Sequence, residues 1–135
     1  MNLTDDQFDE MVAAAWEKIP ERFKDEIENV SIVIEAIPGP AQLSRHGGKG
    51  VLLGLFEGTP KVALGQAEMG VQPSKITIFR DNILLFAKDE NELQNRITEV
   101  LMHEIGHYFG YNEASLFVMD KKLRDNQQKR ASNSD

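Results

Sequence analysis

Residues 103–113 read HEIGHYFGYNE and contain two of the three histidines in the chain, His103 and His107, four positions apart. On a helix, residues four apart lie one turn apart on the same face. Two imidazoles in this arrangement can direct ring nitrogens at one point, as zinc ligands do. The same short pattern also occurs by accident in ordinary helices. The spacing therefore predicts a divalent metal site. If the pattern is accidental, the stretch is an ordinary helix with two partly buried histidines.

Glu104 directly follows the first histidine and is rotated from it by about 100° on a helix with about 3.6 residues per turn. Its carboxylate cannot comfortably share the point where the two imidazoles meet, but it can reach a water molecule bound there. A metal ion lowers the pKa of its water towards about 7, and a neighbouring carboxylate then accepts the proton. The pattern favours hydrolysis with Glu104 as general base.

A catalytic zinc normally has three protein ligands and one open position. A continuous helix would point Glu113 away from the histidines, but Gly110 is the residue best able to enter the left-handed conformation that ends a helix. A reversal there could bring Glu113 back as the third ligand. Asp120 is the alternative if the chain does not fold back. The chain has no cysteine, so imidazole and carboxylate must hold any transition metal, and Zn²⁺ is the expected cofactor.

The composition is that of an ordinary globular domain. Hydrophobic residues make up 41% and charged residues 27% of 135 residues, a length typical of about one domain. A formal net charge of −7 argues against a nucleic-acid partner, because binding to phosphates needs a basic surface. The acidic N-terminal stretch lacks the features of a secretory signal, and the apolar runs are too short to span a bilayer. We expect a cytoplasmic protein without a nucleic-acid or membrane partner.

The spacing of apolar residues predicts two long helices. In the first, apolar residues recur at three- and four-residue steps over residues 8–19, and Pro20 ends the run. In the second, Asp89 and Glu92 have the form of a capping box, and an apolar stripe continues from there to Gly110. The histidine pair lies in the last turns of this second helix.

Between these helices the pattern predicts a small twisted sheet. The expected strands cover residues 30–36, 51–57 and 75–80. Surface loops are expected at 38–50 and 61–74, a short helical turn at 83–87 and a further helix from about residue 112. We therefore expect a single α+β domain over residues 1–125, followed by a polar, disordered tail over residues 126–135.

The HEIGHYFGYNE stretch resembles the extended motif of the zincin metallopeptidases, and the chain resembles the small bacterial family of minimal zincin-like metallopeptidases. The likeness rests on WEKIPERFKDEIENVSIVIE, LLGLFEGTP, ITIFRD and LMHEIGHYFG, in that order within residues 8–120. It implies that His103 and His107 bind zinc, that Glu104 is the general base, and that Glu113 occupies the third-ligand position. Members of the family often carry aspartate at that last position.

The resemblance also implies a fold and a substrate edge. We expect a zincin-like α+β domain in which the N-terminal helix backs the sheet and the metal-binding helix lies across it. Zincins lay their substrate against an edge strand, main chain to main chain, and residues 51–57 are the candidate for that strand.

Four other residues are weaker candidates. Tyr108 and Tyr111 could stabilise a developing oxyanion, although both are expected to pack against apolar neighbours. Met119 fits core packing better than the methionine-bearing turn that metzincins place beneath their metal. His46 has no partner at ligand spacing, and we expect it on the surface.

These residues predict a zinc-dependent metallopeptidase that acts on peptide or protein substrates. One alternative is a metal-binding or protein-interaction module with weak or no hydrolytic activity. Another is a regulatory peptidase specific for one partner protein. Glu104 favours an enzyme over a module, because metal binding alone does not need that carboxylate.

Overall fold

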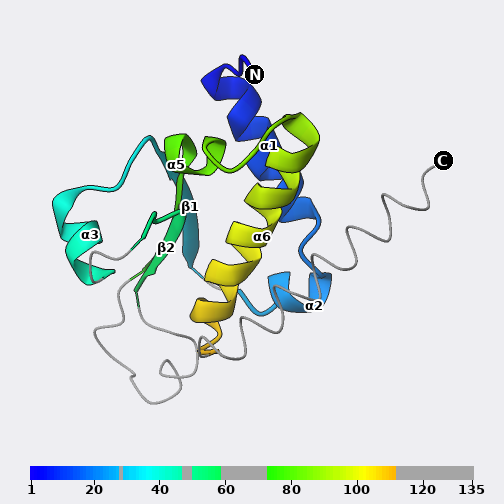
Figure 1. The fold of residues 1–135 in the computed structure, drawn as a ribbon. Helices are drawn as coiled ribbons and strands as arrows, with labels where there is room; N and C mark the ends of the chain where they lie inside the picture. Colours follow the sequence, from blue (N-terminus) through cyan, green and yellow to red (C-terminus); the bar gives the residue numbers. More distant parts are fainter. Residues whose placement is uncertain (28, 47–49, 59–72, 112–135) are drawn as a thin grey trace.

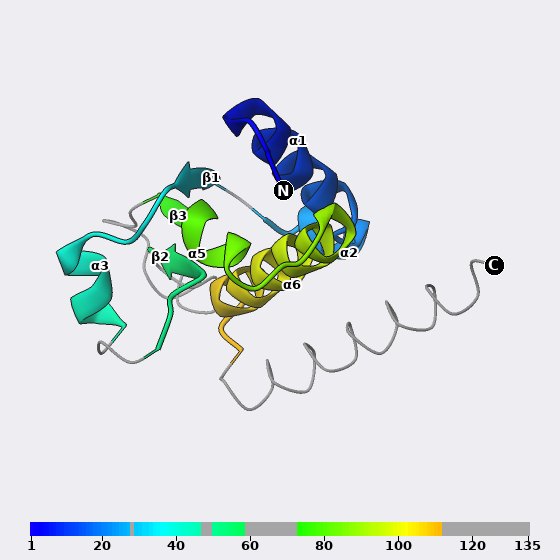
Figure 2. The same ribbon diagram turned by 45° about the horizontal axis from the view of Figure 1, so that its top comes forward.

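The computed structural model describes residues 1–27, 29–46, 50–58 and 73–111. In chain order the elements are α1 (Asp5–Glu17), α2 (Glu21–Lys24), β1 (Val30–Glu35), α3 (Pro40–Arg45), β2 (Gly54–Glu57), β3 (Ser74–Phe79), α5 (Arg80–Leu84) and α6 (Glu90–Tyr108). Helices and strands mix in one small α+β fold, as predicted (Figure 1). Helix α6 packs against β2 and β3, and α1 packs against α6. Helix α3 lies away from both, beyond β2 (Figure 2).

The sheet has the strand order β1-β3-β2, so β3 is its central strand. Strand β1 is parallel to β3, and β2 is antiparallel to it. The predictions for β1 and β3 are confirmed to within one residue. The predicted strand at 51–57 begins only at Gly54. Just before it, the Leu52 carbonyl accepts a hydrogen bond from the Asn82 side chain at 2.8 Å.

Helix α1 has the predicted buried face, which includes Phe8 and Val12. Thr4 caps its N-terminus: its hydroxyl accepts from the Gln7 amide at 3.1 Å, and the Gln7 side chain accepts from the Thr4 amide at 2.8 Å. Pro20 follows the end of this helix as expected, but it also opens the short helix α2, which the sequence pattern did not predict.

The prediction of a loop over residues 38–50 was wrong in part, because Pro40–Arg45 forms helix α3. Pro40 suits the first helical position, where its fixed φ is already helical and its missing N–H is not needed. The Gly39 amide donates to the Gln42 side chain at 2.8 Å, which satisfies one more group at this end. Arg45 then forms an ion pair with Glu57 and so ties the end of α3 to β2.

Helix α6 follows its prediction closely. The Asp89 carboxylate accepts from the Glu92 amide at 2.8 Å at the start of the helix. Its buried stripe consists of Leu93, Ile97, Leu101, Ile105 and Tyr108. The short turn predicted at 83–87 lies slightly earlier, as α5, directly after β3. Among the described residues, no helix is long and apolar enough to cross a membrane.

Strand β2 can approach α6 closely only because residue 54 is a glycine. A Cβ at this position would lie 2.6 Å from Val100 Cγ1 and 3.3 Å from the Thr77 carbonyl oxygen. Valine in a helix has one strongly preferred rotamer, so Val100 cannot easily turn away. The glycine therefore sets the distance between the strand and the helix that carries the histidine pair.

Replacing Gly54 with alanine is expected to destabilise the fold by about 1–3 kcal/mol, the usual range for overpacking a core. Chemical denaturation of both proteins would measure the loss. A double-mutant cycle with Val100→Ala supplies the control, because removing Cγ1 removes the main clash. The penalty of Gly54→Ala should be clearly smaller in the Val100→Ala background. Equal penalties in the two backgrounds would show that this contact does not set the spacing.

Candidate active site

The last turns of α6 bring His103 and His107 together. Their ring centroids lie 5.0 Å apart, with the ring planes at 72°, and both side chains are half-buried. The helix spacing explains this arrangement, since residues four apart share one face. The expectation that the two imidazoles lie side by side is therefore confirmed. Imidazole nitrogens in such a pair suit a divalent transition metal.

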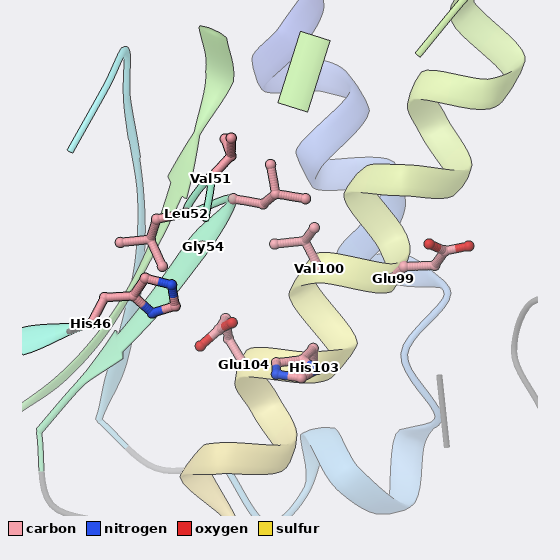
Figure 3. Close-up of a pocket in the computed structure, with 9 residues that line it drawn as sticks. His46, Val51, Leu52, Gly54, Glu99, Val100, His103 and Glu104 are labelled. Atoms are coloured by element: carbon pink, nitrogen blue, oxygen red, sulfur yellow. The ribbon is translucent and has the colours of Figure 1, made fainter. Parts of the chain in front are cut away.

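Glu104 points from the same helix towards β2. The side chain is only 7% exposed, and its Oε1 accepts a hydrogen bond from the Phe56 backbone amide at 3.0 Å. Burial of a carboxylate is costly unless hydrogen bonds compensate it, and the Phe56 N–H supplies one. The main chain of β2 therefore holds this carboxylate beside the histidine-bearing face of α6 (Figure 3).

Strand β2 turns alternate backbone groups away from the sheet. The Leu53 carbonyl accepts from the Phe79 amide at 3.0 Å, on the side of β3, whereas the Phe56 amide is directed at Glu104. Strand β2 stands at one end of the strand order, as expected for the residues proposed as a substrate edge. One outward amide of this edge is thus occupied by Glu104.

A cleft of about 240 Å³ opens between α6 and the chain that leads into β2 (Figure 3). Its lining residues are His46, Val51, Leu52, Leu53, Gly54, Glu99, Val100, His103 and Glu104. Apolar side chains thus surround the two polar groups of α6 that the sequence singled out. Glu99 points away from the others and forms an ion pair with Arg96, with 3.1 Å between Oε2 and Nη1.

His46 is a lining residue whose place in the cleft the sequence did not predict. It is exposed, as predicted, but its ring faces the cleft from the end of α3, opposite Glu104 (Figure 3). No spacing rule connects it to residues 103–107. Among the described residues, the contacts of Gln42 and Arg45 with Glu57 hold α3 against β2 and bring His46 to this place.

The tyrosines differ in position. Tyr108 is 1% exposed and packs edge-on against Phe56, with ring centroids 6.0 Å apart. It belongs to the core, as its place on the apolar stripe indicated. Tyr111 is 42% exposed, just beyond the end of α6.

Gly110 ends α6 in the way the sequence predicts. Its φ is 85°, in the left-handed region, and its amide donates to the His107 carbonyl at 2.9 Å. The Tyr111 amide donates to the Gly106 carbonyl at 3.0 Å. This pair of bonds is the Schellman motif, which closes a helix and turns the chain away from its axis.

The ligand set remains a prediction. Within the described ranges, no group of three or more His, Asp or Glu side chains could hold a metal ion. Glu113, its alternative Asp120, and Met119 all lie outside the described residues, as do the further helix and the tail at 126–135. The donor chemistry of His103 and His107 fits zinc, and a third donor is still required.

A family model described as zincin-like metallopeptidase matches residues 27–122. No curated protein matches the chain. Among solved structures, the chain is similar to a conserved hypothetical protein from T. thermophilus. The two share 24% sequence identity over 78% of this chain and 92% of the other, with a TM-score of 0.51. At this identity the likeness concerns the fold.

Proposed function

The chain belongs to the zincin-like metallopeptidase family, and on that premise we propose that it is a zinc-dependent peptidase that hydrolyses peptide bonds in peptide or protein substrates. The observation that carries the proposal is the arrangement on α6. A buried carboxylate, Glu104, and an imidazole, His103, line the same cleft, and His107 lies beside His103 one turn later. We propose that this chemistry takes place in the cytoplasm.

In this proposal His103, His107 and Glu113 hold the zinc ion. When bound, the metal would supply Lewis-acid chemistry, lowering the pKa of water and polarising the scissile carbonyl. Glu104 accepts a proton from the attacking water on a carboxylate oxygen and passes it to the leaving amine. The Phe56 amide keeps this carboxylate in the cleft, where Val51 and Val100 add an apolar lining.

Incubating the zinc-loaded protein with a mixed peptide library tests the proposed activity. Mass spectrometry would detect the products, and Glu104→Gln purified in the same way controls for contaminating proteases. Cleavage that appears equally in both preparations, or no cleavage by the parent, would contradict a peptidase of general specificity.

The size of the cleft favours one refinement. The part lined by described residues has about 240 Å³, smaller than the roughly 300–1,000 Å³ of typical ligand pockets, and these walls alone contact little more than the residues at the scissile bond. Selectivity would then depend on contacts outside it, as in a regulatory peptidase with one protein partner. Cleavage of a folded partner, with little cleavage of short peptides, would favour that candidate. A metal-binding module would hold zinc and cleave neither.

Zinc is expected to bind with about one equivalent per chain and to raise the melting temperature more at pH 7.5 than at pH 5. Only neutral imidazole donates its lone pair, and free imidazole takes up a proton below about pH 6.5. Stabilisation by zinc through His103 and His107 is therefore present above this pH and lost as the pH falls through it. Thermal melts with and without zinc, together with elemental analysis, measure both quantities. Equal shifts at the two pH values would argue against histidine ligands.

A further inference from the structure

The cleft has a second wall, opposite α6, and His46 is its polar residue. His46 is the C-cap of α3, and its amide donates to the Gln42 carbonyl at 3.2 Å. Its ring is turned into the cleft that His103 and Glu104 line from the other side (Figure 3). A side chain in this position faces whatever occupies the space between the two walls.

Contacts to β2 fix this wall. The Glu57 carboxylate forms ion pairs with Arg45 and with Lys75, the latter at 3.9 Å, and Gln42 Nε2 lies 3.5 Å from Glu57 Oε1. Arg45 immediately precedes His46, so the Arg45–Glu57 pair holds the end of α3 in place. The preceding residue of the strand, Phe56, holds Glu104. Two successive residues of β2 therefore position one polar group on each wall.

The other polar lining residues already have roles or partners. His103 and Glu104 are assigned to the metal and to the base, and Glu99 pairs with Arg96 and points away. Among the described residues, His46 belongs to no group of three or more histidine or acidic side chains that could hold a metal ion. Its imidazole carries an N–H donor in the neutral and in the protonated form. Peptide hydrolysis needs such a donor where the carbonyl oxygen becomes negative, because a positioned hydrogen bond there stabilises the transition state.

We propose that His46 is a substrate-contacting residue whose ring N–H donates a hydrogen bond to the scissile carbonyl oxygen as negative charge develops on it. This role rests on the proposed peptidase function. It makes α3 and its anchor Glu57 part of the site, although α3 lies far from α6 in the sequence. It also predicts that loss of the His46 ring affects the tetrahedral state more than the substrate complex.

The test uses zinc-loaded His46→Ala with two readouts: peptide cleavage and the Kd of a leucyl-leucine phosphinic peptide. In that probe a tetrahedral phosphinate replaces the scissile amide. We expect kcat to fall about 10²-fold with little change in KM, and the phosphinate Kd to weaken by a similar factor. Zinc content should not change. His46→Gln, which keeps an N–H donor, should recover part of both losses, and Leu43→Ala on the same helix should lose neither.

Unchanged phosphinate affinity in His46→Ala would overturn the proposal, and so would a loss of zinc, which would make His46 a metal ligand. A parent protein that binds the phosphinate in a His46-dependent way but cleaves no peptide would refute the peptidase function and leave the contact standing. If the parent and His46→Ala cleave peptides equally well, the peptidase function stands and the His46 contact is refuted. A parent that neither cleaves peptides nor binds the phosphinate would refute both.

Discussion

Replacing Glu104 with glutamine is expected to lower peptide hydrolysis by at least two orders of magnitude, while zinc content and melting temperature stay near those of the parent. A positioned general base contributes about 10²–10⁴-fold in rate. The glutamine side chain has the same shape, and its carbonyl oxygen can still accept the hydrogen bond from the Phe56 amide. The substitution therefore removes the proton acceptor and little else.

Steady-state kinetics on the same peptide, with elemental analysis of both proteins, would measure this effect. His103→Ala is the matched comparison, because it should lose zinc and activity together. If Glu104→Gln binds zinc and retains most of the activity, proton transfer to Glu104 is refuted. A fall in zinc content in Glu104→Gln would instead assign this carboxylate to metal binding.

The parts of the fold that the sequence predicted correctly rest on local signals. Helix α6 has a side-chain cap at Asp89, a long apolar stripe and a terminating glycine at Gly110, and each acts within a few residues. The pairing of His103 with His107 follows from the helix period alone. For the same reason the side-by-side arrangement of the two rings could be predicted without knowledge of the rest of the chain.

The missed features depend on contacts between distant parts of the chain. Helix α3 is only six residues long, too short to be stable alone, and the Arg45–Glu57 pair anchors it to a strand. The position of His46 in the cleft depends on that anchor. The hydrogen bond from Phe56 to Glu104 uses a backbone amide, so the identity of the side chain at position 56 does not predict it. Sequence spacing thus predicts the α6 side of the site and leaves the opposite wall unassigned.

Replacing Glu113 with alanine is expected to weaken zinc binding by an order of magnitude or more, whereas Asp120→Ala should change it little. The reason lies at Gly110, whose left-handed φ and closing hydrogen bonds end α6 within one turn of His107. A chain that leaves the helix axis there needs few residues to return a carboxylate to the histidine pair. Residue 113 comes three positions after the reversal, and residue 120 comes a further seven.

Competition with a chelator of known zinc affinity would measure the Kd of the parent and of both variants at pH 7.5. Glu113→Gln separates charge from size, and it should also bind zinc weakly, because a neutral amide is a poor ligand for this metal. Gly110→Ala extends the test, since an alanine resists a φ of 85° and should weaken zinc binding with Glu113 still present. If Asp120→Ala loses zinc and Glu113→Ala retains it, the assignment is reversed and the third ligand lies on a later segment. The chain would then turn at Gly110 without returning to the histidines.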